Sequence, residues 1–409
     1  MDGHKVYRNP YNRRSRRTGM ANRRRRVVLY FSQWGTPMYT HEKVTLAKVA
    51  ETIAELIGYE FDGEYDPVRH PSGNIYFVPD DTLMQDEALH LGIRSATALY
   101  GGVVPYPFVK TKVITHDLVS PTAAKPKGWS YIFAHIARDV VLPGYSVFDA
   151  DDARIAGKRL LSRGAIRLKE PLGDGGYGQT VITTLHELDA FLEKFSLQKL
   201  ERNGLVVETN LNPLLTRSVG HITIRGQTIA YYGTQRAVTN NNGQLVYGGS
   251  RLVCVRGGWD TLESLPMDPA IRLAVVQARS YDRAGGSYPG FFASRRNYDV
   301  GQGFDVQGRW HSGVFEASWR SGGASTAELA AFVAFARDPT LQVVEASAVK
   351  EFGKPREVPR VAIAHFQGDD PKDGPILRYT MVNRGFDLAA QLPHLGASDP
   401  IFQKAHQRF

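Results

Sequence analysis

Residues 295–325 constrain this chain more than any other stretch, because acids, a cation and turns follow one another closely within it. Two short runs that carry Asp299 and Asp305 lead into an alternating strand at residues 312–316, which ends on a carboxylate. Acids at adjacent strand ends can hold Mg²⁺ against a phosphate, because Mg²⁺ takes one or two carboxylates plus phosphate oxygens. Arg320, which follows that strand, would supply a fixed cation for the charge that develops during phosphoryl transfer.

Length and composition describe a globular chain. Its 409 residues suffice for two or three domains, and its 42% apolar and 22% charged residues are typical of a chain with a sizeable core. No stretch approaches the roughly 18 apolar residues of a membrane span, and no apolar segment follows the basic N-terminus as in a secretory signal. Cys254 is the only cysteine, which excludes an internal disulfide and a cysteine-based zinc site. We therefore expect a cytoplasmic protein.

The formal charge of +9 belongs to the N-terminus. Residues 1–26 hold ten of the 50 Lys and Arg residues and one of the 41 Asp and Glu residues, so the rest of the chain is neutral. We expect residues 1–26 to form a basic, disordered tail. Such a tail could bind nucleic acid or anionic lipid without specificity, and this alternative stays open.

Residues 27–104 have the pattern of a small α/β domain. Continuous apolar runs at residues 27–32 and 75–78 predict buried strands, and the apolar period of residues 41–57 predicts a helix that Gly58 ends. The alternation of strand and helix favours a parallel sheet. Because the segment lacks the common glycine-rich nucleotide motifs, we do not expect it to bind a nucleotide by itself.

A second informative stretch covers residues 165–179. A short strand presents Lys169, Pro171 breaks that strand, and a glycine-rich loop follows at residues 173–178. Backbone amides in such a loop can close over phosphates, and a lysine on the preceding strand can reach the same oxygens. The alternative is a glycine-rich hairpin turn without a ligand.

The middle of the chain predicts further helices and a buried strand. Asp149 stands where an N-cap belongs, ahead of a helix at residues 152–161, and an amphipathic helix is expected at residues 184–195. Residues 205–208 form an apolar run of strand length that ends on a carboxylate.

The last part predicts antiparallel sheet and two helices. Strands alternate with turns between residues 218 and 255, and a helix is expected at residues 273–281. Ser325 and Glu328 have capping-box spacing and predict a helix that runs to about residue 337. Three further strands are expected at residues 343–349, 360–366 and 376–382.

The lysine-bearing strand, the glycine loop, the strand-end Glu208 and the acid-rich stretch, in this order, resemble the ATP-grasp superfamily. Its members bind ATP between two α+β lobes and usually join a carboxylate to an amine through an acyl-phosphate. The resemblance covers about residues 105–340 directly. It implies a pre-ATP-grasp-like parallel α/β domain at residues 27–104, two lobes at 105–208 and 209–340, and a β-rich C-terminal extension at 341–409.

The resemblance also implies contacts with ATP. Lys112, or as an alternative Lys110, would join Lys169 at the phosphates, beneath the loop at residues 173–178. Glu208 would accept the ribose hydroxyls. The nucleotide contacts implied in this way are Lys112, Lys169, Gly173, Gly175, Gly176, Gly178, Val207 and Glu208.

The metal signature of the superfamily is an Asp, a D-x-x-G-like turn and then E-x-N-x-R. Asp299, a turn that begins at Asp305, and the residues from Glu316 onward align with this signature. Ser318 stands where the superfamily usually has Asn, and Asp305 is an alternative ligand to Asp299. The resemblance implies Asp299, Glu316 and Ser318 as Mg²⁺ ligands, and Arg320 and Lys169 as catalytic residues.

The function implied by the resemblance is that of a bacterial, cytoplasmic ligase that depends on ATP and Mg²⁺. It would activate a small-molecule or peptide carboxylate as an acyl-phosphate and transfer it to an amine or a thiol, and a homodimer is compatible with it. Two alternatives stay open: a kinase or nucleotide-binding regulator on the same fold, and a nucleic-acid-binding module that acts through the tail. His116 and His221 are interpreted as ordinary core or surface histidines.

Overall fold

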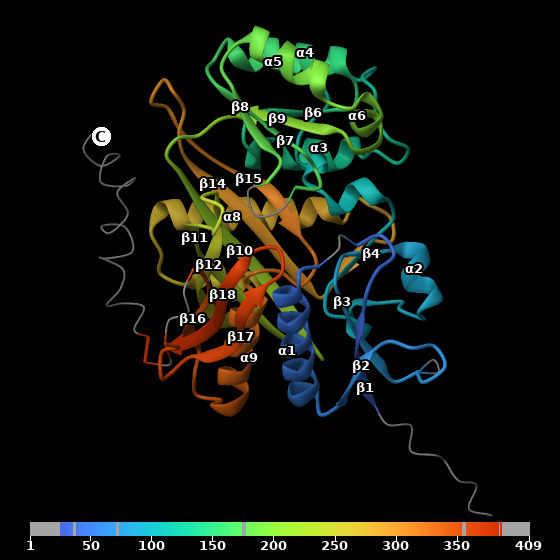
Figure 1. Cartoon of the computed structure of the whole chain (residues 1–409), viewed down its shortest axis with the longest axis vertical. Coiled ribbons are helices and arrows are strands. Elements are labelled where there is room, and N and C mark those ends of the chain that lie inside the picture. The colour runs from blue at the N-terminus through green and yellow to red at the C-terminus, as the bar shows by residue number, and fades with distance from the viewer. Residues whose placement is uncertain are drawn as a thin grey trace, which may run out of the picture.

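The computed structural model describes residues 25–35, 38–70, 73–173, 177–353, 357–383 and 385–386. Nearly all of the expected basic tail lies outside these residues, as do Gly175 and Gly176. In Figure 1, a small lobe with two helices on its outer side stands above a large twisted sheet, and the N-terminal part lies beside the lower end of that sheet. The mixed α/β architecture is as predicted. No helix among the described residues is long and apolar enough to cross a membrane.

The N-terminal part is built on a three-stranded parallel sheet in the order β2-β1-β3, which confirms the predicted sheet type. α1 (Thr40–Ile57) packs against it, and Gly58 ends the helix in the left-handed conformation that glycine adopts most easily. The sequence does not predict β2, because EFDGE is an acidic edge strand without an apolar run. The strands are β1 (Arg26–Tyr30), β2 (Glu60–Glu64) and β3 (Ile75–Pro79).

A second three-stranded sheet, in the order β13-β5-β4, connects this part to the rest of the chain. The strand β13 comes from a much later segment and pairs antiparallel with β5. These elements are β4 (Leu83–Met84), α2 (Gln85–His90), β5 (Gly102–Val104) and β13 (Phe292–Ala293).

The small lobe at the top of Figure 1 is a four-stranded antiparallel sheet in the order β6-β9-β7-β8, with α4 and α5 on its outer side. Asp149 is the N-cap of α4, as predicted, and its carboxylate accepts a hydrogen bond from the Asp152 amide at 2.7 Å. The elements are α3 (Tyr131–Ala137), β6 (Gly144–Val147), α4 (Ala150–Leu161), β7 (Ile166–Lys169), β8 (Gln179–Ile182), α5 (Leu185–Lys194), α6 (Leu197–Asn203) and β9 (Leu205–Thr209).

The large sheet has eight antiparallel strands in the order β15-β14-β10-β11-β12-β16-β18-β17. α8 packs on the β10, β14 and β15 end, and α9 packs on β12, β16 and β18. The elements are β10 (Leu214–Ile224), β11 (Gln227–Thr239), β12 (Leu245–Arg256), α7 (Trp259–Ser264), α8 (Pro269–Gly285), β14 (Arg295–Phe304), β15 (Trp310–Ser318), α9 (Ser325–Arg337), β16 (Val343–Phe352), β17 (Ile363–Asp370) and β18 (Gly374–Asn383).

The three strands predicted after residue 340 are β16, β17 and β18. β16 pairs with β12 over seven residues, so these strands continue the sheet of residues 209–340 rather than form a separate layer. How the chain divides into domains stays a prediction.

α9 runs over the predicted residues, but the predicted capping box is wrong. The N-cap residue is Ala324, which makes no side-chain cap, and Glu328 is fully buried. Glu328 forms an ion pair with Arg295, at 2.7 Å between Oε1 and Nη2, and accepts hydrogen bonds from Tyr100 and Tyr231. These buried partners satisfy the carboxylate in place of the helix-start amides. The network ties α9 to the large sheet and to the N-terminal part.

This network makes a prediction about stability. Arg295→Met should lower the free energy of unfolding by about 3 kcal/mol, because it leaves the buried Glu328 carboxylate without its cation. Arg251→Met is the matched control, because the Arg251 side chain is 53% exposed in its pair with Glu345 and should contribute less than about 1 kcal/mol. Urea unfolding followed by circular dichroism measures both. Equal losses in the two variants would contradict the structural role of the buried pair.

Candidate active site

The hairpin β14–β15 brings the two predicted metal-binding acids together. Asp299 lies directly opposite Glu316 in the antiparallel register, so both side chains project from the same face of the sheet. A bulge follows this pair, and its extra residue is Phe315. Asn297 Nδ2 donates a hydrogen bond to Asp299 Oδ1 at 2.9 Å, and the Ser218 hydroxyl lies 3.4 Å from the same oxygen.

The electrostatics of this pair favour a cation. Burial and the neighbouring Glu316 carboxylate raise the pKa of Asp299 to about 6, and the hydrogen bond from Asn297 offsets this only in part. Among the described residues there is no cluster of three or more His, Cys, Asp and Glu side chains that could hold a metal ion. Two carboxylates completed by phosphate and water oxygens are the set that Mg²⁺ commonly takes, so the residues present fit this ion.

Ser318 and Asp305 differ from Asp299 in their surroundings. Ser318 lies two residues beyond Glu316 on the same face, but its hydroxyl accepts a hydrogen bond from Arg295 Nη1 at 3.3 Å. The positive charge of a guanidinium at this distance repels a metal ion bound at Ser318. Asp305 lies in the β14–β15 turn, where its carboxylate is held by Arg309 at 2.7 Å and by His311 at 2.9 Å. The geometry therefore favours Asp299 over Asp305 as the partner of Glu316.

Lys112 reaches the acid pair from the segment that precedes the small lobe. Its side chain is 2% exposed, and its Nζ lies 3.1 Å from Glu316 Oε2 while donating a hydrogen bond to the Gly173 carbonyl. The alternative, Lys110, is instead engaged by Asp81 at 2.6 Å. The structure thus brings Lys112, and not Lys110, to the acids.

Lys169 and Glu208 form the second charged contact of the site. Lys169 Nζ lies 2.5 Å from Glu208 Oε1 and 4.0 Å from the centroid of the Phe315 ring. Burial lowers the pKa of Lys169, and the Glu208 charge opposes this. Burial would raise the pKa of Glu208, but the Lys169 charge and the hydrogen bond with His116 lower it to about 2. Val207 precedes Glu208 on β9 and is buried.

Sequence reasoning missed His116. Its Nε2 lies 3.1 Å from Glu208 Oε2, so this histidine holds the carboxylate oxygen that Lys169 does not. The two residues are 92 positions apart in the chain, and no local pattern links them. His116 is therefore a buried histidine with a specific partner at the site.

The glycine loop joins β7 to β8, so it is the connection of a hairpin. Gly173 accepts a hydrogen bond from Lys112, and Gly178 has a φ of +69°, a backbone conformation that favours glycine. Gly175 and Gly176 lie outside the described residues. The hairpin is established, and contact of this loop with phosphates stays a prediction.

Arg320 lies at the edge of the site that faces the N-terminal part. Its Nε is 3.8 Å from Asp81 Oδ1, and its backbone carbonyl accepts a hydrogen bond from Arg295 at 2.6 Å. Asp81 also binds Lys110, so it lies between two cations from different parts of the chain. The structure thus adds Asp81, which follows β3, to the surroundings of Arg320.

The raised pKa of Asp299 makes a prediction about pH. Between its ordinary pKa and about 6 the folded protein retains a proton that the unfolded chain has lost, so ionised Asp299 destabilises the fold above pH 6. Asp299→Asn should therefore stabilise the protein by about 2 kcal/mol at pH 8 and have little effect at pH 4.5. Thermal unfolding at the two pH values, without added metal, tests this. A variant no more stable than the parent at pH 8 would contradict the repulsion between Asp299 and Glu316.

Comparisons with known proteins identify the family and the fold. A family model described as "Protein of unknown function (DUF3182)" matches residues 31–380. No curated protein matches the chain. Among solved structures, N5-carboxyaminoimidazole synthetase from Staphylococcus aureus, complexed with ADP, has a TM-score of 0.51 at 12% identity, with 91% of this chain and 96% of that chain covered.

Two more solved structures are similar at lower scores. Phosphoribosylamine–glycine ligase from Thermotoga maritima has a TM-score of 0.45 at 13% identity, with 88% of this chain and 92% of that chain covered. D-alanyl-alanine synthetase A from Vibrio cholerae has a TM-score of 0.39 at 11% identity, with 72% and 88% covered. At such low identity the similarity to the Staphylococcus aureus protein, an ATP-grasp protein, shows the fold alone. The chain belongs to the family described as "Protein of unknown function (DUF3182)" and has the ATP-grasp fold.

Proposed function

We propose that this protein is an ATP- and Mg²⁺-dependent ligase that activates a carboxylate as an acyl-phosphate and transfers it to an amine or a thiol. The observation that carries the proposal is the junction of the two lobes at one charged cluster. Lys169 and Glu208 from the small lobe, and Asp299 and Glu316 from the large sheet, meet there with Lys112 between them. Alternating ammonium and carboxylate groups are what a polyphosphate and its metal ion require.

The lysines would bind the nucleotide by exchanging partners. Lys112 and Lys169 now pair with Glu316 and Glu208, and phosphate oxygens would take the ammonium groups from these carboxylates. Glu316 would then be free to join Asp299 at Mg²⁺, and Glu208 to accept the ribose hydroxyls beside Val207. When bound, Mg²⁺ would neutralise charge on the phosphates. Glu208 would keep its contact with His116, which lowers its pKa and keeps the carboxylate an acceptor at neutral pH.

The reaction that this cluster supports is an in-line displacement followed by acyl transfer. An oxygen of the substrate carboxylate forms a bond to the γ-phosphorus as the bond to ADP breaks, and Lys112, Lys169 and Arg320 stabilise the charge that develops. The amine nitrogen then bonds to the acyl carbon, loses a proton, and phosphate leaves. The loop at residues 173–178 would cover the phosphates, and exclusion of water would protect the acyl-phosphate from hydrolysis.

Nucleotide binding is the first test. Saturation with MgATP at 100 times the dissociation constant should stabilise the parent by about 2.7 kcal/mol in thermal unfolding. Lys169→Met and the double variant Asp299→Asn, Glu316→Gln should lose this gain, because each removes one side of the cluster. Lys199→Met is the matched control, since Lys199 lies in the same lobe with a 43% exposed side chain paired to Glu170. If millimolar MgATP does not stabilise the folded parent protein, the proposal is refuted.

Product analysis separates the ligase from the kinase. A ligase should release ADP only when a suitable acid and a suitable amine or thiol are both present, and it should form one amide or thioester for each ADP. ADP release with a single acceptor, accompanied by a stable phosphorylated product, would assign a kinase instead. A screen of acids and amines that measures ADP and phosphate together distinguishes the two outcomes.

A further inference from the structure

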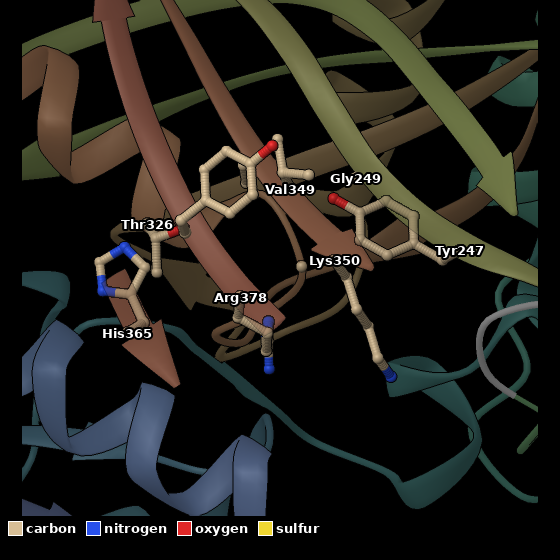
Figure 2. A pocket seen from close by; sticks show the side chains of 10 residues that line it. Tyr247, Gly249, Thr326, Val349, Lys350, His365 and Arg378 are labelled. Atoms are coloured by element: carbon tan, nitrogen blue, oxygen red, sulfur yellow. The ribbon is translucent and has the colours of Figure 1, made fainter. Parts of the chain in front are cut away.

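A second group of cations lies in a small pocket outside the lysine–carboxylate cluster. The pocket is formed by β12, β16, β17, β18 and the start of α9, and its lining includes Tyr247, Gly323, Lys350, His365 and Arg378. Figure 2 shows the Lys350 and Arg378 side chains running in the same direction from neighbouring strands, with His365 to one side. None of these residues has a part in the proposed binding of ATP.

The positive charge in this pocket is only partly compensated. Lys350 and Arg378 lie directly opposite each other in the β16–β18 register, a position in which like charges repel. Lys350 Nζ is 3.5 Å from Asp373 Oδ2, whereas Arg378 has no hydrogen-bond or ion-pair partner within the part of the chain that the structure describes. Burial lowers the pKa of both groups, and the Arg378 charge lowers that of Lys350 further. Asp373 and Glu42, which lies at the start of α1, oppose this at Lys350, and Glu42 opposes it at Arg378.

The other charged groups around the pocket do not remove this excess. The Asp370 carboxylate is paired with His41, at 2.9 Å between Oδ2 and Nδ1. Burial lowers the pKa of His365 to about 4, so His365 is neutral at pH 7 and adds no charge. Its Nε2 instead lies 2.8 Å from the Thr380 hydroxyl, which donates to Thr326 at the start of α9. The cations that line the pocket are therefore Lys350, which has Asp373 beside it, and Arg378.

The start of α9 adds a favourable field at the same place. Gly323 and Thr326 line the pocket, and the N-cap residue Ala324 offers no side-chain acceptor to the first turn. The amides and the dipole at a helix N-terminus favour an anion. Two half-buried cations and a helix start thus converge on one small cavity.

The pocket is connected to the candidate active site by a short turn. The chain passes from Ser318 and Arg320 through Gly322 to Gly323, where a Cβ would lie 2.3 Å from the Tyr247 ring. Glycine at this position lets the turn lie against Tyr247. A substrate that extends along this turn could occupy the acid pair with one group and the pocket with another.

We infer that Lys350, Arg378 and the first turn of α9 bind an anionic oxygen group of the substrate, a carboxylate or a phosphate, apart from the group that is activated. This inference rests on the proposed function and narrows the substrate to an acid that carries a second negative charge. The free space inside the pocket is about 10 Å³, enough for one water molecule, so the anion binds at the opening of the pocket rather than inside it.

Binding of simple anions tests the inference without knowledge of the substrate. Inorganic phosphate and acetate are titrated by calorimetry at constant ionic strength into a Lys169→Met protein, in which the proposed nucleotide phosphate site is weakened. Adding Lys350→Met or Arg378→Gln should lower the affinity for the anion by about tenfold or more, because each substitution removes a charged hydrogen-bond donor. Arg360→Met is the matched control, since Arg360 is an exposed cation in the turn before β17.

The outcomes separate this inference from the proposed function. Which of the two anions binds more tightly distinguishes a phosphate from a carboxylate. Affinities unchanged by both pocket variants, or weakened equally by Arg360→Met, would overturn the inference even if the parent binds MgATP. The opposite result is also possible: the pocket variants lose anion binding, but MgATP does not stabilise the parent. This would support the anion site and refute the ligase proposal. Arg378→Lys, which retains the charge, should restore most of the affinity, and this rescue would show that the Arg378→Gln result comes from loss of the cation and not from loss of folding.

Discussion

The pairing of β14 with β15 holds two carboxylates opposite each other, and the candidate site is arranged around that repulsion. Asp299 and Glu316 cannot move apart, because the register of the β14–β15 hairpin fixes their Cα atoms. Lys112 compensates Glu316, while Asp299 keeps a raised pKa. The fold thus retains an unfavourable charge arrangement that a divalent cation would relieve, which is characteristic of sites shaped for binding rather than for stability.

The buried pair Arg295–Glu328 supports this hairpin on the face that carries the two acids. Arg295 lies on the same face of β14 as Asp299, and its guanidinium also binds backbone and side-chain oxygens at the end of β15. Through Glu328 the same guanidinium is tied to α9, whose first turn lines the anion pocket. One buried cation therefore fixes the positions of both the acid pair and the pocket.

Much of the fold could be predicted from the sequence, because periodic apolar segments determine helices and strands locally. The strand β1, the helix α1 with Gly58 at its end, and the N-cap Asp149 follow from such local patterns. The polar edge strand β2 carried no such pattern.

Contacts across the fold could not be predicted in this way. His116 with Glu208 and Asp81 with Arg320 join residues distant in sequence, and local spacing contains no information about them. For the same reason Glu328 was assigned to a helix cap, although its partner Arg295 lies on another element. The structure brings the motif residues Lys112, Lys169, Asp299 and Glu316 close to one another, and it places the Arg295 guanidinium beside Ser318. Their roles stay predictions.

The most direct test of the nucleotide and metal site is a crystal structure with Mn²⁺ and a non-hydrolysable ATP analogue, with the metal located by its anomalous scattering. We expect Mn²⁺ between Asp299 and Glu316, with Lys112 and Lys169 on the phosphates and Glu208 on the ribose. In that complex Lys169 should have left Glu208, and Lys112 should have left Glu316. A nucleotide bound elsewhere, or lysines still paired with these carboxylates in the presence of the analogue, would contradict this expectation.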